Sequence, residues 1–325
     1  MFSIRVSLLT TDIQQISQEM VEMICDCLKF SLSWDGTSHV LKVDGFETEN
    51  DARKYLRSLQ VGINWLLINN DVPIEANLSP QEISYVEDPL NASDNLSQFF
   101  GVSLGAPIDG FIDGSLAAVF ESDKRLSAYS FNGGKAHTVT PSERVLESIL
   151  EGSRFRNSNQ LENNPKLEVA LKLYGAYYTE SSITARFLTL IIALEAMALP
   201  VPRPQETNRL LDKWSVELEG MINLYNDNDV VHDDLKSLRD EVVRRRESSI
   251  GTQISNLVKA SLIGEADCLE QAKSAKRLYR VRCTLVHDGY VDPQLLGCST
   301  SEAKSLVSRV IRARFLKTLL AEENA

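Results

Sequence analysis

The segment at residues 277–290, RLYRVRCTLVHDGY, decides how the C-terminal half of this chain is interpreted. Its apolar residues recur at the spacing of one helix face, namely Leu278, Val281, Leu285 and Val286. Arg282 falls within that face, and the run ends at His287 followed by Asp288 and Gly289. Because glycine commonly ends helices, the pattern predicts a helix that carries a guanidinium on its packed side and an imidazole near its terminus.

Arg282 needs a partner if its face is packed, because burying an unpaired guanidinium costs free energy. The apolar run FLTLIIALEAMAL at residues 187–199 contains one acidic residue, Glu195. We expect Glu195 to be the buried partner of an arginine, with Arg282 as the candidate. An arginine among aliphatic residues also suits a helix that faces a second subunit.

His287 would lie about 140° around an ideal helix from Arg282, so the two side chains would not converge in a straight helix. The sequence allows two resolutions. The helix could loosen at His287, or two chains could bring their motifs together across a two-fold axis.

The rest of the chain predicts an α+β protein with two domains, an acidic α/β domain at residues 1–155 and an all-helical bundle at residues 156–325. In the first, residues 2–9 and 39–46 are expected strands, and residues 48–70 an expected helix capped by Thr48. A second helix is expected after Thr140 as N-cap, and residues 71–115 look loop-rich. The Asn-rich segment 154–165 is the expected boundary. The expected helices of the bundle lie at 165–180, 181–199 and around 206–225, 231–248, 252–262, 267–287 and 301–321, the last capped by Ser299 and Glu302.

Charge is unevenly distributed along the chain, whose net charge is −11. Residues 1–160 hold 12 Lys and Arg against 22 Asp and Glu, a balance of −10, whereas residues 271–325 hold 10 against 5, a balance of +5. This balance permits a phosphate-bearing partner at the C-terminal segment, whereas nonspecific coating of nucleic acid by the whole molecule is not expected.

Five cysteines without a CxxC pair and four dispersed histidines (His39, His137, His232 and His287) indicate neither a disulfide framework nor a metal site. We therefore expect a cytoplasmic protein without a metal or other cofactor. No apolar run reaches the length of about 18 residues that a membrane helix requires, and the N-terminus lacks the pattern of a secretory signal. A membrane partner is not expected.

The spacing Arg282-X4-His287 resembles the R-X4-6-H motif of the HEPN family of helical-bundle proteins. Tyr279 before the arginine and the LVH triplet resemble the Apea-like HEPN branch, as do ARFLTLIIALEAM and RRRESSIGTQISNLV, and the resemblance covers roughly residues 165–322. Arg280 also satisfies the spacing. We prefer Arg282 because it lies on the expected packed face, whereas Arg280 lies on the solvent side.

The resemblance implies a homodimeric, metal-independent endoribonuclease that acts as a toxin or anti-phage defence effector. The ribose 2′-hydroxyl would attack the adjacent phosphorus, leaving 2′,3′-cyclic phosphate and 5′-hydroxyl ends. His287 would act as general base or acid and Arg282 would hold the phosphate. The N-terminal domain, or a separate regulatory protein or antitoxin, would restrain it. The alternative is a non-catalytic dimeric module that binds a protein partner or a nucleotide.

Three further sets of residues qualify this hypothesis. Some HEPN proteins carry a modifiable tyrosine two residues after the histidine, but here Tyr290 is one place further, so that form of regulation is not expected. Asp288 is a candidate to orient His287 instead. The run Arg244, Arg245 and Arg246 is a candidate contact for the RNA backbone, although three adjacent arginines point in different directions on a helix and usually form a solvated face.

Overall fold

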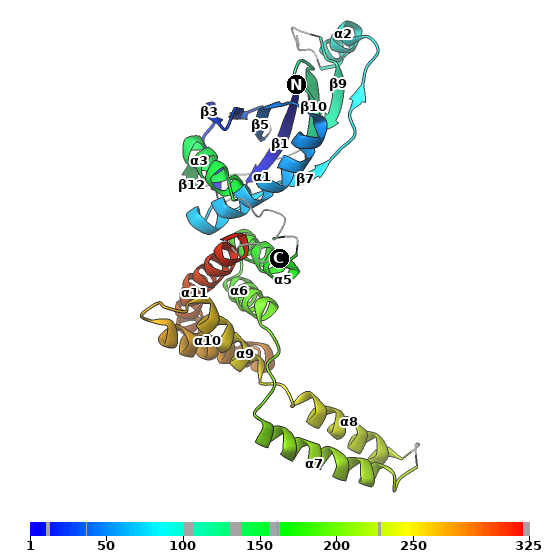
Figure 1. Cartoon of the computed structure of the whole chain (residues 1–325), viewed down its shortest axis with the longest axis vertical. Coiled ribbons are helices and arrows are strands. Elements are labelled where there is room, and N and C mark those ends of the chain that lie inside the picture. Colours follow the sequence, from blue (N-terminus) through cyan, green and yellow to red (C-terminus); the bar gives the residue numbers. More distant parts are fainter. Residues whose placement is uncertain are drawn as a thin grey trace. The chain divides into compact units, whose positions relative to one another are not determined.

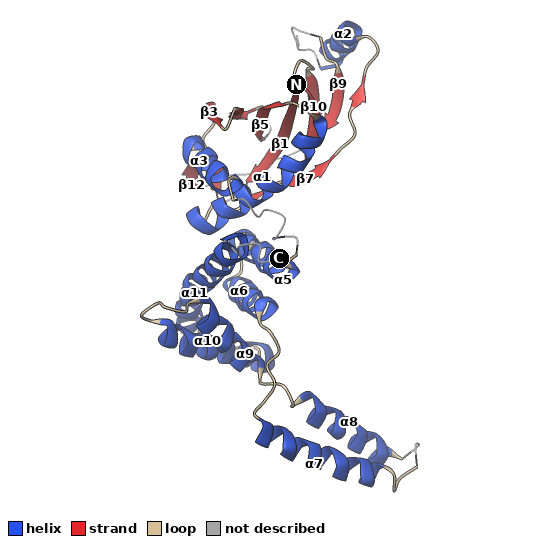
Figure 2. Ribbon diagram, viewed as in Figure 1, coloured by secondary structure: helices blue, strands red, loops and turns tan. Residues whose placement is uncertain are grey.

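The computed structural model describes residues 1–10, 14–36, 38–100, 107–129, 138–155, 161, 163–226 and 229–320. It shows a mixed α+β protein with a sheet in its N-terminal part and helices through its C-terminal part (Figures 1 and 2). The chain divides into two compact units, Met1–Ser181 with Arg314–Ala325, and Ser182–Ala313. The expected boundary segment at 154–165 lies within the first unit, and residues 156–160 and 162 of it are outside the described residues, as are residues 131–137 with His137.

The main sheet of the first unit has the strand order β3-β4-β5-β1-β10-β7, with β6 paired to β1. The strands are β1 (Phe2–Thr10), β3 (Val21–Cys25), β4 (Leu28–Trp34), β5 (His39–Phe46), β6 (Ile74–Glu75), β7 (Asn77–Pro80) and β10 (Leu116–Glu121). The expected strands at 2–9 and 39–46 are confirmed, and they pair antiparallel with Ile4 opposite Val43. Side chains alternate across a strand, so Ile4, Val6 and Leu8 enter one core.

Two helices, α1 (Glu49–Asn70) and α3 (Ser142–Ser153), contribute the other side of that core, including Leu59 and Ile149, which are fully buried. Thr48 caps α1 as expected, because its side chain accepts from the backbone N–H of Asp51 at 3.1 Å. The helices cross closely at two glycines. A Cβ on Gly62 would lie 2.2 Å from the carbonyl oxygen of Ile149, and one on Gly152 would lie 2.4 Å from the Cβ of Trp65.

The start of α3 corrects one expectation. Thr140 is not its N-cap but ends a short strand, β12 (Thr138–Thr140), which pairs with β2 (Gln14–Ile16). Pro141 occupies the cap position and provides no side-chain hydrogen bond. The hydroxyl of Ser17 accepts from the N–H of Ser142 at 2.9 Å instead, so a residue distant in sequence satisfies this helix end.

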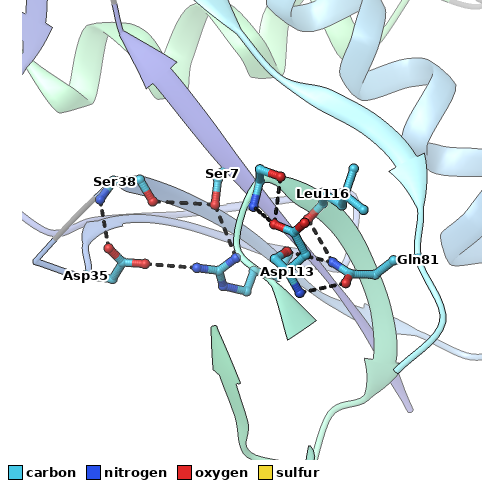
Figure 3. Close-up of polar contacts among 8 residues, drawn as sticks. Ser7, Asp35, Ser38, Gln81, Asp113 and Leu116 are labelled. Carbon is cyan, nitrogen blue, oxygen red and sulfur yellow. Dashed lines mark hydrogen bonds and ion pairs between the residues drawn. The ribbon is translucent and has the colours of Figure 1, made fainter. Parts of the chain in front are cut away.

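The segment 71–115 holds more structure than its composition predicts, because it contains β6–β9 and α2. The segment includes β8 (Ser84–Tyr85), α2 (Pro89–Phe100) and β9 (Gly110–Asp113). Strand β9 pairs with β8 and with β11 (Leu126–Tyr129). Gln81 holds this region to the main sheet (Figure 3). Its amide donates to the carbonyls of Asp113 and Leu116 at 2.8 and 3.2 Å and accepts from the N–H of Asp113 at 2.8 Å.

The second face of β1 is polar rather than apolar. Arg5 pairs with Asp35 at 2.9 Å and donates to Ser7 at 3.2 Å, and Asp35 accepts from the N–H of Ser38 at 2.8 Å (Figure 3). Burial lowers the pKa of Arg5, and the opposite charge of Asp35 counteracts that effect. The main sheet therefore has one apolar face, whereas its second face carries paired charges around β1 and a small apolar cluster of Ile112, Ala118 and Phe120 around β10.

Helix α5 (Pro165–Thr179) belongs to the first unit and is fixed to the end of α1. Its N-cap is Asn164. Asp71, at the C-cap of α1 with φ 56°, accepts hydrogen bonds from the hydroxyls of Tyr174 and Tyr178 at 2.7 and 2.6 Å. Burial raises the pKa of Tyr178, and both the Tyr174 and Asp71 neighbours add to this rise. Tyr178 therefore remains a donor to Asp71.

The described helices of the second unit are α6 (Ile183–Met197), α7 (Gln205–Ile222), α8 (Val230–Arg244), α9 (Ile250–Ser261), α10 (Cys268–Asp288) and most of α11 (Pro293–Leu320). Helix α10 packs against α9 and α6, and α7 packs against α8 (Figure 1). Helix α11 starts earlier than the sequence predicts. Asp292 accepts from the N–H groups of Gln294 and Leu295 at 3.0 and 2.9 Å, so it caps the helix in place of Ser299.

Candidate functional site

Helix α10 carries the Arg282/His287 motif and is anchored near its beginning. Arg309 of α11 makes a two-armed ion pair with Asp267 at 2.7 and 2.8 Å, which holds the pKa of Asp267 down at about 2. Glu302, expected as a capping residue, instead accepts from Arg277 and Ser274 of α10. These contacts fix the register of α10 on α11.

The packed face of α10 becomes exposed toward the C-terminal end of the helix. Ala272, Ala275 and Leu278 are buried, whereas Val286 is 48% exposed. The expected apolar face therefore holds for Leu278 but not for Val286. From Val286 to the end of α10 at Asp288 the side chains, His287 among them, are exposed, whereas Leu285 is half-buried.

Arg282 lies at the edge of the packed part and pairs with Glu195 of α6, as expected. Its Nε is 3.2 Å from Glu195 Oε1, and the two side chains are 25% and 21% exposed. Neither of these two atoms has a hydrogen bond within the described residues. Burial raises the pKa of Glu195, and the charge of Arg282 opposes that rise. A guanidinium has five N–H donors, so this ion pair leaves donors of Arg282 for an anion.

Tyr279 is a member of this cluster that the sequence marked only through the family resemblance. The Arg282 Cζ lies 5.9 Å from the Tyr279 ring centre, and Gly251 of α9 gives the ring room, since a Cβ there would lie 3.0 Å from it. Burial raises the pKa of Tyr279, and Cys283, four residues on, adds to the rise. The i,i+4 spacing of Tyr279 and Cys283 was the available signal.

His287 lies exposed in the last turn of α10. The helix continues through Asp288 and ends at Gly289, whose φ of 72° is left-handed, so the first of the two resolutions, a loosening at His287, is wrong. Five residues of helix separate Arg282 from His287 by about 7.5 Å along the axis and about 140° around it. Within one chain, therefore, the two side chains do not face one point.

The other predicted residues lie apart from this pair. Arg280 is exposed, as its position on the solvent side requires. Asp288 is exposed, and no hydrogen bond or ion pair between it and His287 is present in the described structure. Its proposed orienting role is therefore not built into this single chain.

The arginine run lies at the end of α8. Arg244 is the last residue of the helix and all three arginines are exposed. Arg246 pairs with Asp212 of α7 at 2.7 Å, while the carbonyl of Arg245 accepts from Arg203 at 2.6 Å. Arg246 thus has a structural partner. Arg244 and Arg245 are the two arginines of the run that remain candidates for contacts with RNA phosphates.

No group of three or more His, Cys, Asp or Glu side chains that could hold a metal ion occurs among the described residues. Within the same part of the chain, no helix combines the length and apolar character needed to cross a bilayer. No family model, no curated protein and no solved structure matches this chain. The functional interpretation therefore rests on the Arg282 and His287 motif and its geometry.

Proposed function

We propose that the helical part of the chain from α5 onward is a HEPN-like bundle and that the protein is a metal-independent endoribonuclease. The observation that carries the proposal is the placement of two chemically suited groups on one anchored helix. Arg282 is held against Glu195 with donors to spare, and His287 is exposed at the helix end. A guanidinium binds phosphate and an imidazole exchanges protons near neutral pH.

The proposed reaction transfers a phosphoryl group within the RNA strand. One His287 removes the proton of the ribose 2′-hydroxyl, whose oxygen forms a bond to the adjacent phosphorus. The bond from phosphorus to the 5′-oxygen breaks, and a second, protonated His287 supplies the proton to that oxygen. The guanidinium of Arg282 stabilises the charge on the phosphoryl oxygens. The products are a 2′,3′-cyclic phosphate and a 5′-hydroxyl.

The proposed active form is a homodimer, because one straight α10 does not direct Arg282 and His287 to the same phosphate. Two copies related by a two-fold axis supply two histidines and place the arginine of one chain near the histidine of the other. Exposed apolar side chains near the motif suit such a contact: Val286 is 48%, Tyr290 67% and Leu295 45% exposed. We also propose, from the resemblance to the HEPN family, a role as a toxin or defence effector under a regulatory partner or the N-terminal domain.

The test is RNA cleavage by the full chain in excess EDTA. We expect Arg282→Ala and His287→Ala to lower the rate by at least about 100-fold. Arg280→Ala is the matched control, since Arg280 also fits the spacing but is exposed on the other side of α10, and it should cleave like wild type. Equal background cleavage by all four proteins would reject the nuclease.

A mixing experiment tests the composite site. Wild-type and His287→Ala protomers are unfolded together in equal amounts and refolded as a mixture. Statistical pairing makes half of the dimers mixed, and because the proposed reaction uses the histidines of both chains, only the quarter of dimers that are fully wild type should cleave RNA. Activity at half of the wild-type level from well-folded dimers would mean that each site uses the histidine of one chain only.

The alternative function is a non-catalytic dimeric interaction module. One observation favours it: the ion pair with Glu195 already gives Arg282 a structural partner. Under this alternative Arg282→Ala lowers stability while RNA stays intact in every sample, so the same set of variants distinguishes the two functions.

A further inference from the structure

The first unit contains a cavity of about 810 Å³ between α1, the segment carrying β6 and β7, and α5. This volume falls within the range of about 300–1,000 Å³ that small-molecule sites occupy. Its apolar walls come from residues packed in the fold, such as Leu56, Val61 and Leu67 of α1 and Leu171 of α5, which are at most 8% exposed. The cavity is therefore built on fixed helices.

One face of α1 supplies the polar side of this cavity. Arg53, Arg57, Gln60 and Asn64 all line it, and their spacing of four, three and four residues places them in one row along the helix. The carboxamide of Gln60 donates to Asn64 Oδ1 at 3.4 Å. Asn77 of β7 adds a third carboxamide to the lining. The row thus begins with two guanidiniums and continues with carboxamides.

Two of the basic side chains around the cavity, those of Arg53 and Lys172, are held by exposed ion pairs. Arg53 pairs with Glu49 at 2.7 Å and Lys172 of α5 pairs with Glu168 at 2.7 Å, and the two basic side chains are 43% and 75% exposed. Exposed ion pairs contribute little free energy, so a phosphate can replace a carboxylate on these cations. The cavity lining contains three basic side chains, Arg53, Arg57 and Lys172, and two acidic ones, Glu75 and Glu168. This local excess of basic groups stands out because residues 1–160 are strongly acidic.

We propose that this cavity binds a nucleoside monophosphate. Arginine matches the geometry and charge of a phosphate. Carboxamides offer a donor and an acceptor side by side, which is how proteins pair with the edge of a base. The aliphatic wall from Leu56 to Leu67 contacts the faces of the base. The site is independent of the Arg282 and His287 motif, which belongs to the second unit.

The test is calorimetric titration of the full chain with AMP, GMP, CMP and UMP, in the absence of RNA. At least one nucleotide should bind with a submillimolar Kd, and the matching nucleoside without phosphate should bind at least about tenfold more weakly. Gly175→Leu fills the cavity from α5. The new Cβ would meet only Leu67, at an ordinary 3.8 Å, so the backbone accommodates it.

Gly220→Leu is the matched control, because a Cβ there meets nothing within 4 Å and the residue lies on α7. Binding should disappear in Gly175→Leu and persist in Gly220→Leu. If Gly175→Leu does not fold, Arg57→Gln replaces it as the test variant. Arg57→Gln should bind the nucleotide about tenfold more weakly than wild type, whereas the control Arg209→Gln on α7 should bind it with unchanged affinity. The proposal is overturned by no binding of any of the four nucleotides, by equal binding of nucleoside and nucleotide, or by binding that survives in Gly175→Leu or Arg57→Gln. Since no RNA is present, these outcomes are separate from the fate of the proposed nuclease.

Discussion

Replacing Gly62 with alanine tests the packing that positions α1, and so the face of α1 that lines the cavity. A Cβ at this position would lie 2.2 Å from the carbonyl oxygen of Ile149, whereas ordinary contacts begin at 3.4 Å. The helices α1 and α3 must therefore separate locally by roughly 1 Å, the difference between those two distances. The obstacle is backbone, so no side-chain rotation relieves it.

The magnitude follows from two opposing effects. Overpacking a close-fitting core costs about 1–3 kcal/mol, and the upper part of that range applies because Leu59, Ile63 and Ile149 beside the crossing are 0–3% exposed. Alanine favours a helix over glycine by about 1 kcal/mol, which offsets part of the loss. The net destabilisation of Gly62→Ala should be about 2 kcal/mol, which lowers the Tm of this unit by about 4–8 °C.

Gly175→Ala is the control, because its Cβ would meet Leu67 at an ordinary 3.8 Å. That variant should gain up to about 1 kcal/mol from helix propensity alone. Urea unfolding of wild type and both variants, followed by circular dichroism and tryptophan fluorescence, measures the difference. A Gly62→Ala protein as stable as Gly175→Ala would refute the close crossing of α1 and α3.

Three further predictions concern single polar groups. Burial raises the folded-state pKa of Glu195, so wild type loses stability as pH rises from about 4.5 through that raised pKa. The unfolding free energy of Glu195→Gln relative to wild type, measured in urea at several pH values, should therefore increase with pH. A decrease with pH would contradict the burial of this carboxyl group. The hydrogen bonds from Arg309 lower the pKa of Asp267 to about 2, so the stabilisation by these bonds is present above about pH 4 and disappears as pH falls through 2. The unfolding free energy of Asp267→Asn should therefore depend less on pH in this acid range than that of wild type. Tyr174→Phe removes one of the two hydroxyls bound to Asp71 and should lower the unfolding free energy in urea by about 1 kcal/mol, whereas an unchanged midpoint would mean that this contact does not hold α5.

Local patterns predicted most of the elements that need only neighbours in sequence. The alternation in β1 and β5 and the Thr48 cap of α1 were read correctly, because strand faces and N-caps depend on residues a few positions apart. Two cap assignments failed. Thr140 extends a strand paired with β2, and Glu302 binds Arg277. In both places a partner distant in sequence competes for a residue whose local pattern fits a cap.

Residues 277–290 by themselves determined a helix with Arg282 on its packed side and His287 two residues before a terminating glycine, because a period of 3.6 residues fixes the relative directions of side chains on one helix. Only the tertiary structure decided that Glu195 is the partner of Arg282, that His287 stays helical and exposed, and that a row of α1 side chains borders a cavity closed by α5. The physical reason is that ion pairs, exposure and cavities arise between elements far apart in the chain. A sequence pattern specifies what each helix offers, and packing selects what each side chain meets.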